Sequence, residues 1–476
     1  MPADSPSGAA AETLIARCAA VVGGRKIVVV GGVLAGWTQF IRQIRGYGAT
    51  QVLVVAQGTG TGELPTAEEA TTVVIPPPPT ETVTEEIRTW IEFSANPPPA
   101  AMEAVEAFDP GGEAVCLLDP FATVTTYCGR EALGGRTDEM EQLEDKTLAD
   151  GIWDAAGLRR APSVVVPVDR DLLGAAHAGL DRGYGTVWSG DAAEGMNGGA
   201  DRVRWVRSEA DVAAALVLFS PSTRHVRVMP FLEGVPCSIH GFVLPDGVAA
   251  FRPLEQIVVR HPDTGRFTPA GLSTCWDPPE TDREEMRTAA RSVGELIGDR
   301  FGHRGGFAVD GVLTGQGFLP TELNSRFSGG LGVMARGMPD LPLGLVQMAT
   351  MAGVDLGISA EDFERLLVET ADRFRFGQAS AVSRHVSPTS TETIAVCGDP
   401  QQLTEAADGD NVVGTVELGP ANVGALVRYR PVDMAPGLRL APYAVAALRF
   451  ADERWQTGFG PLEMAANVRT PDTHPG

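Results

Sequence analysis

The sequence predicts a mixed α/β protein, α+β in its arrangement, with three or four domains. Residues 25–60 show a strand–helix–strand pattern, in which two apolar runs flank an amphipathic stretch. Residues 226–251 and 305–330 resemble antiparallel strands joined by short turns that contain glycine. The chain has 476 residues, 43% of them apolar, which is enough for several hydrophobic cores.

Residues 1–137 are predicted to form a Rossmann-like domain around a parallel sheet. Its strands would begin at Lys26 and Gln51, and the strand-like residues 114–119 would close the sheet. The turn at residues 31–36, GGVLAG, lacks the full G-x-G-x-x-G spacing of a dinucleotide-binding fingerprint. No acidic residue ends the second strand either, so an NAD-dependent oxidoreductase is a minor alternative.

Three further segments follow. Residues 138–228 contain a helical stretch, short strands and a glycine-rich loop, and are predicted to form a small lobe or lid. Residues 229–360 contain the antiparallel strands, a helix over residues 283–301 and a hairpin, and are predicted to form a large lobe. Residues 361–476 are rich in strand-forming residues, glycine and proline, and form a C-terminal domain whose role the sequence leaves open.

Charge and composition limit the partners of the chain. The formal net charge of −23 argues against a nucleic-acid partner, because phosphate backbones recruit basic surfaces. No apolar run approaches the roughly 20 residues of a membrane helix, and the N-terminus lacks a basic segment followed by an apolar one. We therefore expect a cytoplasmic protein with no membrane and no nucleic-acid partner, and the sequence leaves a homodimer open.

The most informative segment is the hairpin at residues 305–330. Pairing of its arms about the turn Thr314-Gly-Gln-Gly317 places Asp310 opposite Glu322, and the period of two puts Asn324 on the same face. Two carboxylates at roughly 5 Å across a strand pair repel each other, and a divalent cation removes that repulsion. Mg²⁺ prefers oxygen ligands and is held by one or two carboxylates together with substrate phosphates.

Arg326 continues this polar face, where a guanidinium can bind a phosphoryl group or an oxyanion. The opposite face is predicted to join the core through Val309, Leu313, Leu319 and Leu323. The alternative is a solvated polar face on an edge hairpin. The row of Asp, Glu, Asn and Arg beside Ser328-Gly-Gly330 favours the metal site over that alternative.

This hairpin resembles the metal-binding hairpin of the ATP-grasp superfamily, in which an aspartate on one strand precedes Glu-x-Asn-x-Arg on the next. The resemblance implies that Asp310, Glu322 and Asn324 hold Mg²⁺ against the phosphates of ATP, and that Arg326 stabilises the transferring group. It covers residues 143–353 and implies a two-lobed ATP-grasp fold behind a Rossmann-like pre-ATP-grasp domain. The pattern is also similar to actinobacterial ATP-grasp peptide ligases of the kind used in pheganomycin biosynthesis.

Further matches occur in the order that the superfamily has. Lys146 resembles the first nucleotide lysine, which contacts ATP phosphate, and its alternative is a surface lysine at the start of a helix. Residues 228–234 resemble the strand that carries adenine. The resemblance implies base contacts from the main chain of Met229 and Phe231 and a ribose contact from Glu233, whereas an ordinary turn is the alternative.

The flexible loop that closes over the phosphates in this superfamily matches Gly195, Asn197, Gly198 and Gly199. Glycine lets backbone amides approach a phosphate closely, although a surface linker has the same composition. Ser189 stands where many members have a second lysine, and Arg202 and Arg204 are candidate substitutes. This departure leaves room for a nucleotide binder without turnover.

A last group of residues is expected near the substrates: His240, Arg252, Arg260, Ser328, Gly329 and Gly330. The histidine would contact substrate or handle a proton, and the two arginines would pair with a substrate carboxylate. The backbone amides of residues 328–330 would face that carboxylate and later the oxyanion. A structural histidine and ordinary surface ion pairs are the alternatives.

The function predicted is an ADP-forming, ATP-dependent ligase that joins a small-molecule carboxylate to an amine or peptide acceptor, in peptide or secondary-metabolite biosynthesis. A carboxylate does not acylate an amine directly because oxide is a poor leaving group, whereas an acyl phosphate releases phosphate. ATP and Mg²⁺ would be the cofactors, with Lys146 and Arg326 as catalytic residues. Alternatives are a dipeptide or amino-acid ligase of the same mechanism and a non-catalytic nucleotide-binding regulator.

Overall fold

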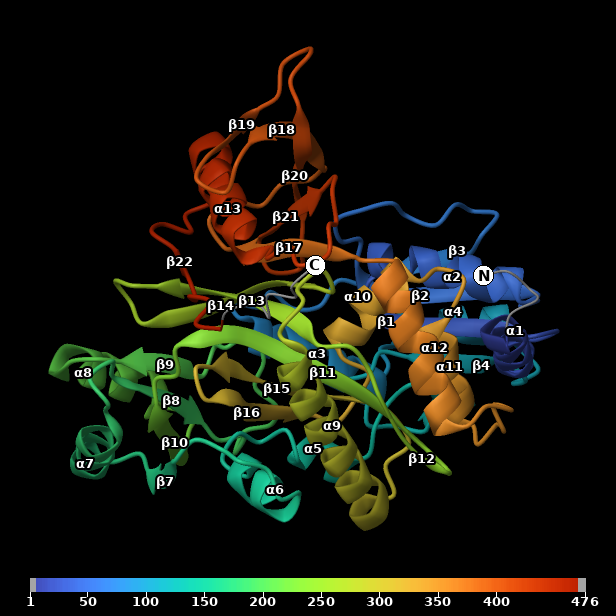
Figure 1. Ribbon diagram of the computed structural model, residues 1–476. Coiled ribbons are helices and arrows are strands. Elements are labelled where there is room, and N and C mark those ends of the chain that lie inside the picture. Colours follow the sequence, from blue (N-terminus) through green and yellow to red (C-terminus); the bar gives the residue numbers. More distant parts are fainter. Residues whose placement is uncertain (1–5, 470–476) are drawn as a thin grey trace.

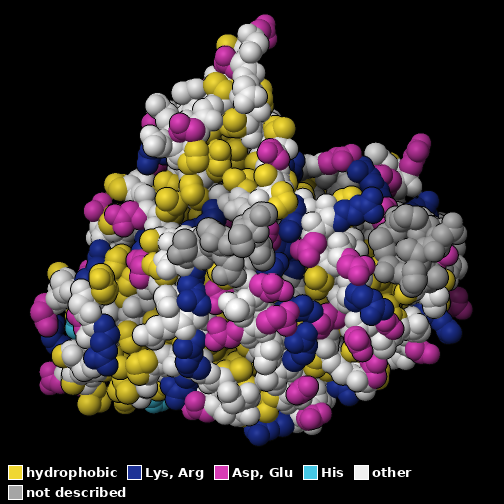
Figure 2. Space-filling view, in the orientation of Figure 1, with side chains coloured by type: hydrophobic (Ala, Val, Ile, Leu, Met, Phe, Trp, Pro, Cys, Tyr) yellow, Lys and Arg dark blue, Asp and Glu magenta, His cyan; other side chains and the backbone are white. Residues whose placement is uncertain are grey.

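The computed structural model describes residues 6–469 and contains three sheets. Figure 1 shows the N-terminal sheet on the right, the lid on the lower left, and the C-terminal strands above the central sheet. None of the described helices is long and apolar enough to cross a membrane. On the face drawn in Figure 2, acidic side chains are interspersed with arginines and lysines. The mixed α/β fold class predicted from the sequence is confirmed.

The N-terminal sheet has the strand order β3-β2-β1-β4-β6-β5, and β1 pairs in parallel with both β2 and β4. Its strands are β1 (Lys26–Val33), β2 (Gln51–Gly58), β3 (Thr71–Val74), β4 (Val115–Leu118), β5 (Thr126–Tyr127) and β6 (Arg130–Leu133). The helices are α1 (Pro6–Ala19), α2 (Thr38–Gly46), α3 (Val83–Ala95) and α4 (Pro99–Phe108). The strand order reverses at β1, and in open parallel sheets the carboxyl edge at such a switch point is where ligands bind.

The lid is a four-stranded antiparallel sheet in the order β7-β10-β8-β9. It follows the short helices α5 (Asp138–Gln142) and α6 (Ala149–Ala155). Its elements are β7 (Val164–Pro167), α7 (Arg170–Leu180), β8 (Thr186–Gly190), β9 (Val203–Val206), α8 (Glu209–Phe219) and β10 (His225–Pro230). Trp188 and Phe219 are fully buried between the sheet and its helices and hold this small lobe together.

The central sheet has 12 strands, ten of them in the order β16-β15-β11-β13-β14-β17-β21-β20-β18-β19, while β12 pairs with β11 and β22 with β13. Its first half contains β11 (Gly234–Leu244), β12 (Gly247–Ala250), β13 (Leu254–His261), β14 (Arg266–Ser273), β15 (Gly305–Thr314) and β16 (Gly317–Asn324). Helix α9 (Glu280–Phe301) packs on β11 and β12, close to the helix predicted there.

The C-terminal segment extends this same sheet, because β17 (Gly377–Ser383) pairs with β14. The remaining elements are β18 (Glu392–Gly398), β19 (Leu403–Glu405), β20 (Val412–Pro420), β21 (Ala425–Pro431), α13 (Ala441–Trp455) and β22 (Glu463–Met464). The boundary expected after residue 228 falls inside β10, and the boundary expected after residue 360 falls inside α12 (Ala360–Arg373).

The N-terminal domain shares a hydrophobic core with helices that follow the hairpin. These helices are α10 (Gly329–Gly337), α11 (Leu343–Met351) and α12. One cluster of buried side chains contains Leu14 and Ile41 from the N-terminal domain together with Leu345 and Phe363. Burial of such side chains contributes roughly 2 kcal/mol each. The shared core therefore fixes the N-terminal sheet beside the hairpin and sets the position of its carboxyl edge.

Candidate active site

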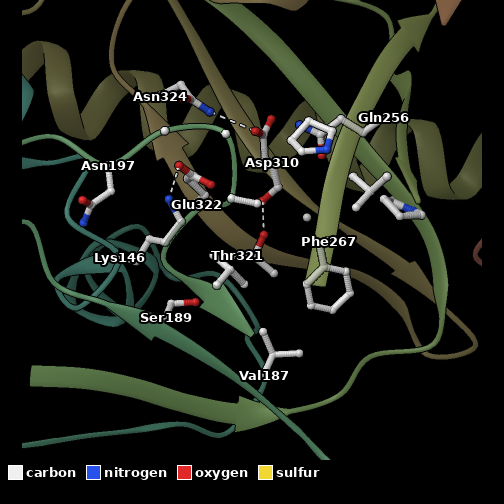
Figure 3. Close-up of a pocket in the computed structure, with 18 of the residues that line it drawn as sticks. Lys146, Val187, Ser189, Asn197, Gln256, Phe267, Asp310, Thr321, Glu322 and Asn324 are labelled. Atoms are coloured by element: carbon white, nitrogen blue, oxygen red, sulfur yellow. Dashed lines mark hydrogen bonds and ion pairs between the residues drawn. The ribbon is translucent and has the colours of Figure 1, made fainter. Parts of the chain in front are cut away.

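A cavity of about 580 Å³ is lined by residues of the lid, the central sheet and the N-terminal domain. Figure 3 shows polar side chains gathered on one wall: Lys146, Asp310, Glu322 and Asn324. Val187 and Phe267 are apolar residues that line the cavity below and beside them. This arrangement of a few convergent polar groups beside apolar walls is typical of small-molecule sites.

The hairpin places Asp310 directly opposite Glu322, as the sequence predicts. The turn pairs Thr314 with Gly317, a register that by itself would bring Asp310 opposite Thr321. A β-bulge adds one residue to β16 between Pro320 and Glu322 and restores the predicted pairing. The hydroxyl of the extra residue, Thr321, donates to the main-chain oxygen of Asp310 at 3.2 Å.

The same bulge corrects one predicted core position. Val309, Leu313 and Leu323 are buried against α9, as predicted. Leu319, however, packs with Met229 on the cavity side of the sheet. Because the bulge interrupts the alternation of side chains, residues before it lie on the face opposite to the one that a regular strand would give them. Phe318 fills the core position instead.

Asp310 is in an environment that disfavours its negative charge. Burial, together with the charge of Glu322, raises the pKa of the Asp310 carboxyl to about 6. Asn324 Nδ2 donates to Asp310 Oδ2 at 2.9 Å, so these two side chains already touch. The two carboxylates repel each other across the strand pair, and a divalent cation between them would relieve this repulsion.

Two cations flank this acidic pair. Lys146 Nζ lies 2.6 Å from Glu322 Oε1, which brings the residue matched to the nucleotide lysine to the same wall as the hairpin. On the other side Arg326 donates to Asn324 Oδ1 at 3.0 Å and lies 4.3 Å from the ring centre of Phe121. Phe121 follows β4 at the carboxyl edge of the N-terminal sheet. The N-terminal domain therefore contributes directly to this wall.

The donor set fits Mg²⁺ in the chemistry of its atoms. Asp310, Glu322 and Asn324 offer hard oxygen ligands on neighbouring strands. Among the described residues there is no group of three or more His, Cys, Asp or Glu side chains able to hold a metal by themselves. Two carboxylates and one amide oxygen therefore suit an ion that completes its shell with substrate phosphates and water.

The segment matched to the adenine strand lies beside the hairpin, since Met229 packs with Leu319. Met229, Phe231 and Leu232 line the cavity. Trp205 stacks on the Phe231 ring with 4.3 Å between the ring centres. The Phe231 amide already donates to the carbonyl of Gly185 at 3.0 Å, so this N–H group is not free for a base. An apolar slot remains, which suits the faces of a flat ring.

Glu233, to which the resemblance assigns a ribose contact, is engaged in other interactions. It is absent from the described residues that line the cavity. Its two carboxylate oxygens accept from Arg260 at 2.7 and 2.9 Å, and one of them also accepts from the Ala466 amide. This bidentate pair also engages Arg260, which lines the cavity and was expected to bind a substrate carboxylate.

The glycine-rich loop is closed against helix α3 of the N-terminal domain. Asn197, Gly198 and Gly199 line the cavity, whereas Gly195 does not. Thr84 and Gly198 exchange hydrogen bonds of 3.1 Å in both directions. The Arg88 guanidinium donates to the Met196 carbonyl at 3.0 Å and to Asn197 Oδ1 at 3.2 Å.

Ser189 lines the cavity, so the missing second lysine leaves a short hydroxyl there. Arg202 and Arg204, the candidate substitutes, direct guanidinium nitrogens at main-chain carbonyls of the protein. Arg227, which the sequence did not single out, is the direct cross-strand neighbour of Ser189 and also lines the cavity. It donates to Asp150 Oδ1 at 2.7 Å and to the carbonyl of Thr321 at 3.3 Å. Arg227 therefore braces the bulge beside Glu322.

His240 is a structural residue and does not face the cavity. Its side chain is buried, and burial lowers the pKa of the imidazole to about 3. The ring lies against Gly330, where a Cβ atom would overlap it. Ser328 and Gly329 begin α10 immediately after the hairpin, and the Ser328 hydroxyl is buried with no hydrogen-bond partner among the described residues. The His240 ring therefore determines how closely the start of α10 can approach β11.

Arg252 is also an internal residue. It is buried, forms ion pairs with Asp277 and with Asp372, and donates to the Thr274 carbonyl. Neither this arginine nor His240 is among the described residues that line the cavity. The alternatives of a structural histidine and of ordinary ion pairs therefore agree with the geometry better than substrate contacts do.

The segment predicted as a glycine turn, residues 31–36, begins inside β1, and its first two glycines leave no room for a dinucleotide. A Cβ atom at Gly31 would overlap the Trp37 indole, and one at Gly32 would overlap the Trp90 indole. The two glycines accept tryptophan rings closely, and the space that a pyrophosphate needs in a dinucleotide fold is filled. The geometry disfavours the oxidoreductase alternative.

No family model matches the sequence, and no curated protein does. Solved structures do resemble it. Carboxyaminoimidazole ribonucleotide synthase from Aspergillus clavatus, complexed with ATP, has a TM-score of 0.52 at 13% identity, covering 90% of this chain and 98% of that one. The N5-carboxyaminoimidazole synthase structure from the same organism, with ADP and aminoimidazole ribonucleotide, gives 0.51 at 12% identity, covering 90% and 99%.

Phosphoribosylamine–glycine ligase from Thermotoga maritima has a TM-score of 0.50 at 13% identity, covering 92% of this chain and 97% of that one. These structures have the ATP-grasp fold, and at such low identity the likeness concerns the fold alone. The chain therefore has the ATP-grasp fold that the hairpin implied. The coverage extends over nearly all of both chains and so includes the N- and C-terminal segments.

Proposed function

We propose that the protein is an ADP-forming ligase that uses ATP to join a carboxylate to an amine or peptide acceptor. The observation that carries this proposal is the convergence of Lys146, Asp310, Glu322, Asn324 and Arg326 on one wall of the cavity. Acidic side chains alone would suit a metal-binding site, and basic side chains alone would suit an anion-binding site. Together they suit transfer of a phosphoryl group, in which charge must be neutralised on both sides.

The proposed reaction has two steps. A carboxylate oxygen of the first substrate attacks the γ-phosphorus of ATP, the bond to the bridging oxygen breaks, and ADP leaves. The amine nitrogen then attacks the carbonyl carbon of the acyl phosphate, inorganic phosphate departs, and the amine loses a proton to solvent. The protein has no bond of its own to make or break, so its tasks are positioning and charge neutralisation.

Each residue of the wall has a task in this scheme. Mg²⁺ held by Asp310, Glu322 and Asn324 would neutralise phosphate charge. Lys146 Nζ, 2.6 Å from Glu322, is near enough to the hairpin to bind a phosphate oxygen beside it. Arg326 lies in the segment between the end of the hairpin and the start of α10, where backbone amides can stabilise a carboxylate or an oxyanion.

Exclusion of water is assigned to the glycine-rich loop. An acyl phosphate hydrolyses if water reaches it, so a ligase needs a cover over its cavity. The loop lines the cavity while Thr84 and Arg88 hold it from the N-terminal side. A peptide or an amino acid would enter along the wall formed by Gln256, Leu272 and Ser380, which continues the cavity toward the C-terminal strands.

The proposal is tested with a panel of carboxylates and amines, incubated with ATP and Mg²⁺. ADP release is followed, and the amide product is identified by its mass. We expect one combination to give both products, and Glu322→Gln to lower ADP release by about 10³-fold while the thermal unfolding midpoint stays within a few degrees. Full activity of that variant would contradict the metal assignment. ATP binding without ADP release across the whole panel would favour the nucleotide-binding regulator instead.

Within the ligase class, the acceptor distinguishes a dipeptide or amino-acid ligase from a peptide ligase of secondary metabolism. The panel therefore contains free amino acids and short peptides with the same N-terminal residue. A kcat/KM that rises with peptide length would support a peptide acceptor. Product formation with free amino acids only would exclude it.

A further inference from the structure

Three arginines lie close enough for their charges to interact, where the N-terminal domain, helix α10 and the C-terminal strands meet. Arg336 lies in the last turn of α10, and Arg428 and Arg430 lie on β21. A single acid, Glu417 on β20, pairs with two of them: its distances are 2.7 Å to Arg428 Nε and 3.3 Å to Arg430 Nη1. Glu417 thus pairs with two of the three guanidinium groups and leaves Arg336 without an acid, in a chain whose net charge is −23.

Arg336 has no compensating partner. It makes no hydrogen bond or ion pair with any residue between 6 and 469; the residue reaches the surface, but its neighbours remove part of the hydration of its guanidinium. Loss of solvation and the charges of Arg428 and Arg430 lower the pKa of its guanidinium. The same kind of repulsion acts on Arg430. Positive charges that are held close together and only partly neutralised attract an anion.

The cluster adjoins the active-site cavity through Ser380, although none of its three arginines is among the described residues that line the cavity. Arg428 is the direct cross-strand neighbour of Ser380, which lines the cavity, and its Nη2 donates to the Thr61 carbonyl at 3.2 Å. Thr61 lies in the loop after β2, at the carboxyl edge of the N-terminal sheet. Ligands of open parallel sheets bind at this edge. Arg428 therefore lies next to the end of the proposed substrate cleft that the C-terminal strands form.

Helix α10 connects the two ends of that cleft. Its open face carries Gly329 at the start and Gly332 in the middle, and no atom lies within 4 Å of a Cβ placed at Gly332. Arg336 follows one turn later on the same face. A helix rises 1.5 Å per residue, so the start of α10 and Arg336 are about 10 Å apart.

We propose that Arg336, Arg428 and Arg430 bind a second anionic group, a carboxylate or a phosphate, on the substrate whose reacting carboxylate lies at the start of α10. This inference rests on the proposed ligase function and narrows its substrate class. The substrate is a bifunctional anion whose two charged groups lie about 10 Å apart. Arg428, which is buried and paired, fixes the subsite, and the exposed Arg336 and Arg430 close on the anion.

The first test needs no knowledge of the substrate. The full-length protein, with ADP and Mg²⁺ present to fill the nucleotide site, is titrated calorimetrically with inorganic phosphate and separately with succinate. We expect Arg336→Gln and Arg430→Gln each to weaken binding of the preferred anion about tenfold. Arg449→Gln is the matched control, because this exposed arginine lies on α13 against the other face of the C-terminal strands. The probe that binds more tightly shows whether the subsite prefers a phosphate or a carboxylate.

Absence of binding to the wild-type protein, or equal affinities in all four proteins, would overturn the proposal. A second test uses the active pair from the substrate panel together with an analogue in which the second anionic group is an amide. Arg336→Gln should raise KM for the anionic substrate about tenfold, leave KM for ATP unchanged, and have no effect on the amide analogue; Arg336→Lys should restore part of the loss. If no panel member yields ADP, the ligase function fails while the titration still decides the anion subsite.

Discussion

The β15–β16 hairpin and the loop at residues 195–199 both line the cavity, but their shapes have different origins. The hairpin is ordered by its own ladder, which joins neighbours such as Asp310 and Glu322. The loop is ordered by helix α3, through bonds such as those of Arg88 to Met196 and of Thr84 to Gly198, across 108 and 114 positions. The hairpin is therefore prepared to hold ligands permanently, whereas the loop closes only while α3 holds it.

The largest effect is expected on the hairpin side, at Lys146. Lys146→Met removes the ammonium that lies 2.6 Å from Glu322, and kcat/KM should fall about 10²- to 10³-fold because one pre-positioned charge is lost from the phosphoryl-transfer site. ADP release with the active substrate pair measures this.

The only other lysine provides the control. Lys26 Nζ donates to the carbonyl of Phe108 at 2.9 Å, inside the N-terminal domain. Lys26→Met should retain kcat/KM within about twofold, with a small loss of stability. If both variants lost activity equally, Lys146 would have no special part in the chemistry.

The next effect concerns the helix that starts where the hairpin ends. Gly330→Ala places a methyl group in the His240 ring and should displace the start of α10, lowering kcat about 10- to 100-fold. Gly329→Ala is the matched control, because the nearest atom to its new Cβ is Leu272 Cδ1 at 3.6 Å. Circular dichroism and thermal unfolding of both variants separate a displaced helix from an unfolded chain, and equal activities would refute the role given to His240.

A smaller effect is expected when the loop loses its anchor. Arg88→Ala removes the hydrogen bonds to the loop, each worth about 1 kcal/mol, and should raise KM for ATP about fivefold with little change in the metal affinity of the hairpin. Amide hydrogen exchange at residues 195–199 should become faster. Glu92→Ala, on the exposed side of the same helix, should change neither quantity. Unchanged exchange in Arg88→Ala would show that α3 does not hold the loop.

The smallest effect on activity is expected at Glu86, where a substitution tests the stability of α3 itself. Burial raises the pKa of the Glu86 carboxyl from 4.5 to about 6. The carboxyl therefore ionises in the unfolded chain at lower pH than in the folded one. Through this group the free energy of unfolding should fall by about 2 kcal/mol in total as the pH rises from well below 4.5 to well above 6. Glu86→Gln should lose this decrease and be more stable than the wild type at pH 7.5.

Urea unfolding at pH 4.5 and pH 7.5 measures the Glu86 contribution. Glu92→Gln is the control on the same helix and should follow the pH dependence of the wild type. A Glu86→Gln variant that gained nothing at pH 7.5 would contradict the burial of a charge at this position. Since α3 holds the loop, its stability also limits the time for which the loop stays closed.

The sequence could predict what local pairing determines. Alternation around a short turn was enough to bring Asp310 opposite Glu322 and to put Asn324 on the same face. Asp310 pairs with Glu322 as predicted. The pairing of Thr314 with Gly317 at the turn would by itself shift this register by one residue, and the bulge at Thr321 compensates for the shift. Leu319 shows the limit of this reasoning: a bulge has no clear signature in the sequence, and alternation alone places this residue on the wrong face.

Tertiary contacts account for what the sequence could not predict. His240, Arg252 and Arg260 are polar residues on strands, a pattern that fits a substrate site as well as it fits an internal network. Only the fold shows that Glu233 occupies Arg260 and that α10 covers His240. Arg227 was missed for the same reason, since its place beside Ser189 depends on a pairing of strands 38 positions apart in the chain.

The central claim is that Asp310, Glu322 and Asn324 share one divalent cation with the phosphates of ATP. Anomalous diffraction from crystals grown with Mn²⁺ and a non-hydrolysable ATP analogue tests it most directly. The account predicts a manganese peak at bonding distance from oxygen atoms of all three side chains and of the nucleotide phosphates. A peak away from the hairpin, or a nucleotide bound with no manganese at these residues, would contradict it.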